Sequence, residues 1–515
     1  MSAFVTDQFR ILNANNFVDS VVDSSNSYYV FLGLPNPDPA SIGFGRTDNW
    51  NINPVIPTDN FSYQNHYKDT SIFGKKITSS NIRRIIRKVD WVANTQYEMY
   101  RHDYSIYNLS PLSQSARLYD CNYYVVNSDY RVYICIDNGS SGINPTIEGS
   151  QDEPTFIDLE PSAAGTSGDG YVWKYLFTIS PSDIIKFDST EYIVVPNDWQ
   201  KSTDPQIVSV RENGDSSLNQ NQIKKIYIEN GGLNYNSGTV RILGDGSGGE
   251  VSIAVDSNGS IISTTVISGG SGYTYGIVDL GSLQKSSSLT NYAKLIPIIP
   301  PSKGHGYDLY KELGTDKILI YARFDDSTKD FPIDTKFSQI GIVKNPKSFG
   351  SDVIFTQNQY SSLYAIRLTS GTAPVVGQKI TQTVTNGIAK GYVASYDSET
   401  QVMKYFMDRS LYYNPTTGYC DQTDYYGVSD QSEVLSFESS STNAIQPYSA
   451  SIDVNLNDNK VTVGSKVVDL GVVFNGGLAN PEINKSSGDI IYIDNRSLVS
   501  RSSRQKEDIK IILEF

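Results

Sequence analysis

The chain has 515 residues and a formal net charge of -14, which excludes binding of nucleic acid through a general basic surface. Its three cysteines, Cys121, Cys135 and Cys420, are too few for a disulfide framework in a chain of this length, and free thiols indicate folding in the cytoplasm. The segment MSAFVTDQFR lacks the order of a signal peptide, and no apolar run approaches the ~18 residues of a membrane helix, so we expect no membrane insertion.

Short β-branched and aromatic runs alternate with turn residues along most of the chain. The sequence contains 36 Tyr and 40 Gly, and 38% of its residues are hydrophobic. Runs of this kind, separated by Asn, Asp, Gly and Ser, predict a mainly β protein rich in turns. The tyrosines fit strands and fit subunit contacts equally well, because the ring buries area while the hydroxyl keeps a hydrogen bond. A chain of this length is expected to form roughly two to four domains.

The amino-terminal segment begins with weak signals. Residues 1–23 mix apolar and polar side chains and predict either a helix or a loop. A strand is expected at residues 28–34, YYVFLGL, because β-branched and aromatic residues dominate it. A loop rich in Pro and Asn follows, and it includes GFGRTDNW at residues 43–50.

Residues 74–91, GKKITSSNIRRIIRKVDW, hold six basic residues. A helix beginning at Ser80 would place pairs of these cations one turn apart, an unfavourable arrangement unless an acidic partner faces them. The run is therefore either a solvated face or a patch that binds a partner. The candidate partner-contact residues are Arg83, Arg84, Arg87, Lys88 and Trp91.

The next elements are two predicted strands and a long loop. The strands cover residues 121–127 and 130–137, and Ser128 and Asp129 join them. Residues 138–170 form a loop rich in Gly, Ser and Pro. Loops of this length in compact proteins are often functional or contact surfaces.

The strongest strand signal covers residues 171–179, YVWKYLFTI. Alternate side chains of a strand point to one face, and here that face is wholly apolar or aromatic while the opposite face is mixed. Burying its five side chains contributes roughly 10 kcal/mol gross, before chain entropy is subtracted. Residues 180–183, SPSD, then predict one capped helical turn, and a strand follows at residues 191–195. The core candidates are Tyr171, Trp173, Tyr175, Phe177 and Ile179.

Two polar regions occupy much of the remaining chain. Residues 205–295 contain IENGGLNY and the similar VISGGSGY, and because a two-copy GGxxY repeat is too short for a solenoid, we predict a small inserted β module. Residues 348–470 are rich in Tyr, Ser and Thr and predict an inserted β domain. The chain ends in EDIKIILEF, which predicts a buried core strand. Its core candidates are Ile509, Ile511, Leu513 and Phe515.

The search for catalytic and binding motifs gives no specific match. Gly244, Gly246 and Gly249 fit a GxGxxG pattern, but the strand-like EVSIAV follows, whereas dinucleotide binding needs a helix there. A glycine hairpin is the better interpretation. The three histidines, His66, His102 and His305, lack the spacing of metal ligands. We therefore expect no enzyme activity, cofactor or metal.

Several segments, taken in order, resemble one family. They are DGYVWKYLFTI followed by TEYIVVP, the upstream GFGRTDNW, the basic run ending in Asp90 and Trp91, FSQIGIVKNP, and the terminal GDIIYIDNR with IKIILEF. Together they resemble the baseplate wedge subunit of T-even-like contractile-tailed phages, the gene-product-eight family. The resemblance covers roughly residues 1–200, 300–347 and 485–515, and the two polar regions have no counterpart in it.

The resemblance implies a structural, non-enzymatic protein of β-sandwich type with a discontinuous core. It implies a homodimer in each baseplate wedge of a virion tail assembled in the host cytoplasm, beside the counterparts of gene products six, seven and ten. The subunit would hold its neighbours and take part in the baseplate rearrangement on host contact. The expected domains are a discontinuous β core of residues 1–95, 296–347 and 471–515, a second β domain of residues 96–204, and the inserted regions 205–295 and 348–470.

A different class of function stays open on the sequence. Gly-, Tyr- and Asn-rich β chains with many acids also serve as receptor-binding or glycan-degrading tail proteins. A cleft with two acids flanked by exposed aromatic rings would favour that class. The inserted regions could also be carbohydrate-binding modules on a structural core.

Overall fold

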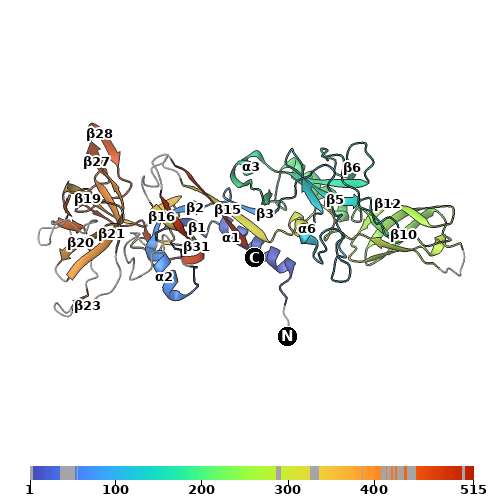
Figure 1. The fold of residues 1–515 in the computed structure, drawn as a ribbon, viewed down its shortest axis with the longest axis horizontal. Helices are drawn as coiled ribbons and strands as arrows, with labels where there is room; N and C mark the ends of the chain where they lie inside the picture. The colour runs from blue at the N-terminus through green and yellow to red at the C-terminus, as the bar shows by residue number, and fades with distance from the viewer. Residues whose placement is uncertain are drawn as a thin grey trace. The chain divides into compact units, whose positions relative to one another are not determined.

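The structure is a computed structural model, and its chain divides into two compact units (Figure 1). It describes residues 4–34, 53–54, 56–285, 291–324, 336–384, 387–407, 413–414, 419–420, 424–425, 434–437, 448–500 and 505–515. Unit 1 comprises Met1–Val18, Arg83–Leu319 and Ile511–Phe515, and unit 2 comprises Asp19–Ile82 and Ile320–Lys510. Both units are discontinuous in sequence. The finer division into four domains stays a prediction, and the segment GFGRTDNW lies outside the described residues.

A four-stranded antiparallel sheet in unit 1 contains the aromatic strand. Its order is β4-β5-β7-β6, with bounds Tyr124–Val126, Arg131–Asn138, Tyr171–Thr178 and Ser162–Ala163. The five aromatic and apolar side chains expected in the core are all buried. The opposite face is mixed, as expected: Lys174 and Leu176 are buried, while Val172 is half-buried and Thr178 is exposed. The rings of Tyr171 and Trp173 stack, with centroids 5.5 Å apart.

Helix α3, Pro181–Phe187, follows β7 where the sequence predicted a helical turn. The Ser180 hydroxyl accepts a hydrogen bond from the Asp183 N–H, and Pro181 occupies the first turn, where its missing N–H costs nothing. Strand β8, Tyr192–Val195, then joins a second sheet of order β32-β15-β3-β8. The other strands of this sheet are β3 (Ile82–Arg87), β15 (Lys317–Phe324) and β32 (Glu507–Glu514).

The GGxxY region of unit 1 follows helices α4 and α5 in the chain and contains a four-stranded sheet, β12-β11-β10-β13, and the pair β14-β9, whose buried side chains share one core cluster. The second glycine of each copy, Gly232 and Gly270, has a positive φ of 60° and 61°, a conformation that glycine adopts without strain. Tyr235 and Tyr273, which end the two copies, are buried in one core cluster. The elements are α4 (Pro205–Gly214), α5 (Ser216–Asn219), β9 (Ile226–Asn230), β10 (Gly238–Gly244), β11 (Ser247–Val255), β12 (Ile261–Ser271), β13 (Gly276–Val278) and β14 (Lys294–Pro297).

Further elements contribute to unit 1. Helix α1 spans Asp7–Val22, so the ambiguous first segment is helical, and its residues up to Val18 belong to unit 1. The 3-10 turn η2 spans Leu118–Asp120, and helix α6 spans Leu309–Leu313. Gly314 ends α6 with a φ of 66°, and a Cβ there would lie 2.4 Å from the Tyr119 ring, so both backbone and packing require glycine.

Unit 2 contains a five-stranded sheet of order β18-β2-β1-β16-β31. Every residue of the central strand β1, Tyr28–Gly33, is buried, which confirms the strand predicted at this position. Helix α2, Phe61–Thr70, leads into β2. The other strands are β2 (Ser71–Ile77), β16 (Lys336–Lys344), β18 (Gln359–Ser361) and β31 (Asp489–Ser500).

A seven-stranded sheet in unit 2 has the order β22-β21-β20-β25-β26-β19-β29 and closes on itself through β22 and β19. Its interior is apolar, with Ile366, Ile380, Val393 and Met403 fully buried. The strands are β19 (Tyr364–Gly371), β20 (Lys379–Val384), β21 (Gly387–Asp397), β22 (Val402–Met407), β25 (Val434–Phe437), β26 (Tyr448–Ile452) and β29 (Leu478–Ala479). Short pairs are β17 (Lys347–Ser348) with β30 (Ile483–Asn484), β23 (Tyr413–Asn414) with β24 (Tyr419–Cys420), and β27 (Lys460–Val463) with β28 (Lys466–Asp469). The predicted fold class, mainly β, is confirmed.

Candidate interaction site around strand β3 and Arg117

Residues 82–87 of the basic run form strand β3, and Arg84 lies inside unit 1. Residues 84–87 pair with β8, so the helix considered for this segment does not form. The Arg84 side chain is buried, at 3% exposure for the residue. Its Nε donates to Asn15 Oδ1 at 2.6 Å and its Nη1 to the Asn197 carbonyl at 3.1 Å. The guanidinium also lies 4.2 Å from the centroid of the Tyr310 ring, a cation–π contact.

Two neighbouring cations, Arg83 on β3 and Lys88 directly after it, also have partners within unit 1. Arg83 forms an ion pair with Asp183 of helix α3 at 2.9 Å and lies 5.3 Å from the centroid of the Phe187 ring. Lys88 lies 3.7 Å from a carboxylate oxygen of Asp188. These contacts hold α3 against the sheet that contains β3. The acidic groups that face Arg83 and Lys88 therefore belong to the same chain.

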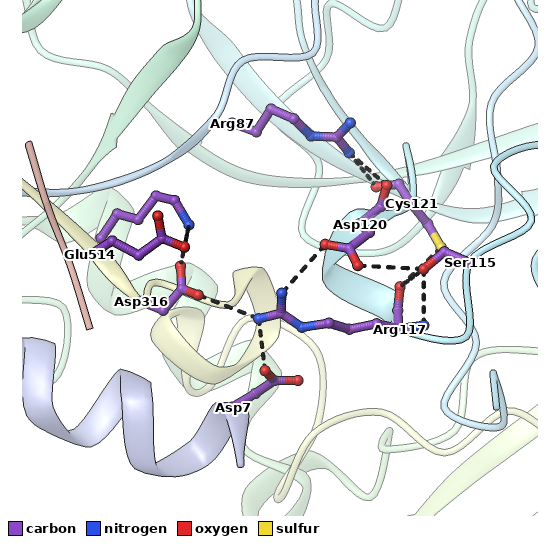
Figure 2. Close-up of polar contacts among 9 residues, drawn as sticks. Asp7, Arg87, Ser115, Arg117, Asp120, Cys121, Asp316 and Glu514 are labelled. Carbon is purple, nitrogen blue, oxygen red and sulfur yellow. Dashed lines mark hydrogen bonds and ion pairs between the residues drawn. The ribbon is translucent and has the colours of Figure 1, made fainter. Parts of the chain in front are cut away.

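Arg87 and Trp91 contact two loops. Arg87 Nη2 donates to the carbonyl oxygens of Asp120 and Cys121 at 3.1 and 3.0 Å (Figure 2). Trp91 Nε1 donates to Ser150 Oγ at 3.1 Å. Contact of these residues with another protein stays a prediction, and Arg84 is the member whose burial leaves least surface for it.

Arg117 is the centre of an ionic network that the sequence analysis did not find. Its guanidinium meets Asp7 at 2.7 Å, Asp316 at 3.3 Å and Asp120 at 3.4 Å (Figure 2). Burial lowers the pKa of Arg117, but the three carboxylates outweigh burial and raise this pKa above its usual value. One side chain therefore links helix α1, turn η2 and the residue before β15.

The network continues to the end of the chain. Lys317 Nζ lies 3.2 Å from Asp316 Oδ1 and 2.9 Å from Glu514 Oε1. The rings of Phe17 and Phe515 pack with centroids 5.8 Å apart, and the Phe515 N–H donates to the Asp316 carbonyl. The last residues of the chain are thus fixed by charge, ring packing and backbone. Of the four core candidates, Ile509 and Ile511 are buried, while Leu513 and Phe515 are half-buried.

Buried ionisable groups elsewhere in unit 1 are internal contacts. His305 Nδ1 lies 2.6 Å from Glu312 Oε1, both residues are buried, and the Gly306 N–H donates to the second Glu312 oxygen at 2.7 Å. Lys174 Nζ donates to the Leu159 carbonyl and to Asn213 Oδ1, and burial lowers the pKa of Lys174 to about 8. All three side chains are already satisfied by the chain, which is the usual state of buried polar groups.

A small pocket lies at the carboxyl end of β7. It has a volume of about 170 Å³ and its lining includes Phe177, Val194 and the two acids Asp183 and Asp204. Asp183 is paired with Arg83, and Asp204 accepts the first N–H groups of helix α4. Both carboxylates therefore hold structure in place.

The remaining motifs behave as local structure within the described residues. Gly244 ends β10 and Gly249 lies in β11, so the GxGxxG pattern is a β-hairpin, as expected. Among the described residues, no three His, Cys, Asp or Glu side chains gather as a metal site. None of the helices described here is long and apolar enough to cross a bilayer.

Comparisons with known proteins relate part of this chain to one family. Residues 135–232 match the family model Phage-Gp8, described as Bacteriophage T4, Gp8. The matched segment runs from β5 through the aromatic strand β7 and on through α4 and α5 to β9, beyond residue 204 where the inserted module was expected to begin.

One curated relative is the baseplate wedge protein gp8 of Enterobacteria phage T4. It is 26% identical over 231 residues, which are 39% of this chain and 63% of the relative. The match thus spans less than two thirds of the relative's length. The resemblance to the Gp8 family that the sequence motifs indicated is confirmed over this part of the chain.

Proposed function

We propose that the chain is a structural subunit of a contractile phage tail baseplate wedge. The observation that carries the proposal is the match to the Gp8 family over residues 135–232, which contain the buried aromatic strand β7. On this proposal the protein is not an enzyme and is located in the virion tail. It holds neighbouring wedge proteins and takes part in the baseplate rearrangement on host contact.

The internal contacts of unit 1 support a role that needs a stiff frame. Chain segments far apart in sequence are joined by Arg117, Lys317 and the buried Arg84. A subunit that transmits a rearrangement must move as a rigid body about its contacts, and such cross-links favour rigid-body motion. Stable contacts of this kind bury ~1,200–2,000 Å² or more.

We propose as partners a second copy of the chain and the counterparts of gene products six, seven and ten. The proposal includes no nucleic acid and no membrane insertion. Two copies per wedge would place the chain in a homodimer, and the net charge of -14 favours neighbours with basic or neutral surfaces at the points of contact.

Reconstitution tests the proposal. The chain is co-expressed with the candidate neighbours encoded by the same phage, and native mass spectrometry measures the composition of the purified complex. We expect a complex that contains two copies of this chain. A chain that joins no neighbour, but releases oligosaccharides from host surface glycans, would instead establish the glycan-degrading alternative.

A further inference from the structure

A loop of unit 1 exposes apolar side chains at the tip of a tight turn. We call Tyr104–Leu112 the apolar loop. Ile106 is 73% exposed and Tyr107 is 93% exposed. The residues on either side, Ser105 and Asn108, exchange two backbone hydrogen bonds of 2.9 and 3.1 Å, so Ile106 and Tyr107 are the two central residues of the turn. Leu109 and Leu112 are exposed as well.

The first end of the apolar loop is fixed by an arginine. Arg101 meets both carboxylate oxygens of Asp103, at 2.8 Å from Nε and 2.6 Å from Nη2. The same guanidinium lies 4.1 Å from the centroid of the Tyr227 ring on β9. Asn108 Nδ2 donates to the Asp103 carbonyl at 3.2 Å, which ties the turn to this base. A bidentate pair of this kind fixes orientation as well as distance.

The second end is fixed by a buried carboxylate. Glu98 is fully buried and accepts hydrogen bonds from the backbone N–H of Leu112 at 3.2 Å, Ser113 at 2.8 Å and Asn122 at 2.8 Å. The Ser113 hydroxyl donates to it at 2.6 Å. The tip is therefore held in one conformation before any partner arrives. A contact made by such a loop loses little conformational entropy on binding.

The apolar loop carries no charge. After Asp103 the next charged residue is Arg117, although the chain as a whole has a net charge of -14. Without cations, the loop has nothing to attract phosphate groups or an anionic surface. An uncharged apolar patch also suits contact between identical chains, because an isologous interface presents the same patch to itself and any net charge there would repel its copy.

We propose that the apolar loop is the centre of the interface between two copies of this chain. Ile106 and Tyr107 of one copy pack against the same loop of the other, and the half-buried Ser105 and Asn108 supply a polar rim. This inference rests on the homodimer of the proposed function and assigns its contact surface. Interfaces concentrate their binding energy in a few central side chains of this kind, tyrosine prominent among them.

The test is the double variant Ile106→Ser with Tyr107→Ser, measured by sedimentation equilibrium. We expect the dimer dissociation constant to rise by at least ~30-fold, as for the loss of a central contact. The matched control is Ile185→Ser with Tyr292→Ser, because these side chains are 80% and 62% exposed elsewhere in unit 1. The control variant should keep the wild-type dissociation constant.

A second measurement gives a positive signal. Near a two-fold axis the same residue of both copies comes close together, so Tyr107→Cys should form a covalent dimer with a short bis-maleimide, and Ile185→Cys should not. Wild-type protein gives the background from the natural cysteines, of which Cys121 and Cys135 are buried.

Each other outcome overturns the inference in a distinguishable way. If the double variant remains as dimeric as wild type, the homodimer stands and the assigned surface is wrong. If wild-type protein is monomeric at every concentration, the homodimer fails and this contact fails with it. If wild type floats with phosphatidylcholine vesicles while the double variant does not, and dimerisation is unchanged, the loop contacts lipid instead.

Discussion

Strand β3 and the apolar loop lie close together in sequence but differ in the surroundings of their side chains. β3 carries three arginines, and the structure gives each of them a partner inside unit 1. The apolar loop carries no charge and leaves Ile106 and Tyr107 in solvent. A cation can pair with an acid of its own chain as readily as with an acid of another protein. An exposed apolar tip held in one conformation leaves most of its apolar surface uncovered by its own chain. Charge density alone is therefore a weak indicator of a contact surface.

The largest expected effect comes from reversing the buried charge of β3. Arg84→Glu places a carboxylate next to the Asn15 and Asn197 oxygens that now accept hydrogen bonds, in a site with almost no solvent. An unpaired buried charge costs about 3–5 kcal/mol, so the free energy of unfolding in urea should fall by that amount.

Arg87→Glu is the matched control, because Arg87 lies at the exposed end of the same strand. This variant loses two hydrogen bonds to carbonyl oxygens, so its free energy of unfolding should fall by about 1–3 kcal/mol. An equal fall in the free energy of unfolding for the two variants would contradict the difference in burial between Arg84 and Arg87.

Glu98→Gln tests whether the charge of Glu98 holds the apolar loop in place. Burial raises the pKa of Glu98, but hydrogen bonds from Ser113 and from the Asn122 backbone outweigh burial and hold this pKa below its ordinary value of 4.5. A lowered folded pKa means that the carboxylate stabilises the fold above about pH 4.5 and loses this contribution as the pH falls through the folded pKa. At pH 7 the free energy of unfolding of the variant should be about 1–3 kcal/mol lower than that of wild type.

The pH series is the discriminating measurement for Glu98. The difference between wild type and Glu98→Gln should shrink as urea unfolding is repeated at successively lower pH, because the protonated wild-type side chain resembles the amide. A difference that stays constant from neutral to acidic pH would mean that the charge of Glu98 does not hold the loop.

Arg117→Met is expected to have a smaller effect, since this side chain is about one third exposed. The variant leaves Asp7, Asp120 and Asp316 without their shared cation, and a loss of about 1–2 kcal/mol is expected. High salt should reduce the difference from wild type, because it screens partly exposed pairs. Arg117→Lys keeps the charge but not the forked geometry of the guanidinium. Its free energy of unfolding should lie between those of wild type and Arg117→Met. A salt-independent loss would point to packing instead of charge.

Local signals made β7 and helix α3 predictable from sequence. Two-residue alternation identified the strand, and Ser180 with Pro181 identified the start of the helix. The conformation of β3 was not predictable in this way, because Ile82, Ile85 and Ile86 have the spacing of a helical face and pairing with β8 overrides it.

The partners of Arg117 were beyond reach of sequence reasoning for a different reason. Asp7 and Asp316 lie far from Arg117 along the chain and come together only in the folded unit. The apolar loop did leave a signal, the uncharged stretch from Tyr104 to Ala116 in an otherwise acidic chain. That stretch becomes informative only once the structure shows that its apolar side chains are outside the core.

The smallest expected effect tests the exposed side of the comparison. Ile106→Ser with Tyr107→Ser should change the free energy of unfolding, measured in urea at a protein concentration where the chain is monomeric, by no more than ~0.5 kcal/mol. The reason is that both side chains are largely solvated, at 73% and 93% exposure, so their removal opens no buried cavity. A loss above about 1 kcal/mol would make the two residues part of the fold and remove the contrast with β3. A neutral result leaves two large apolar side chains that the fold does not use, on a loop that Arg101 and Glu98 hold rigid, and that combination is what a contact surface requires.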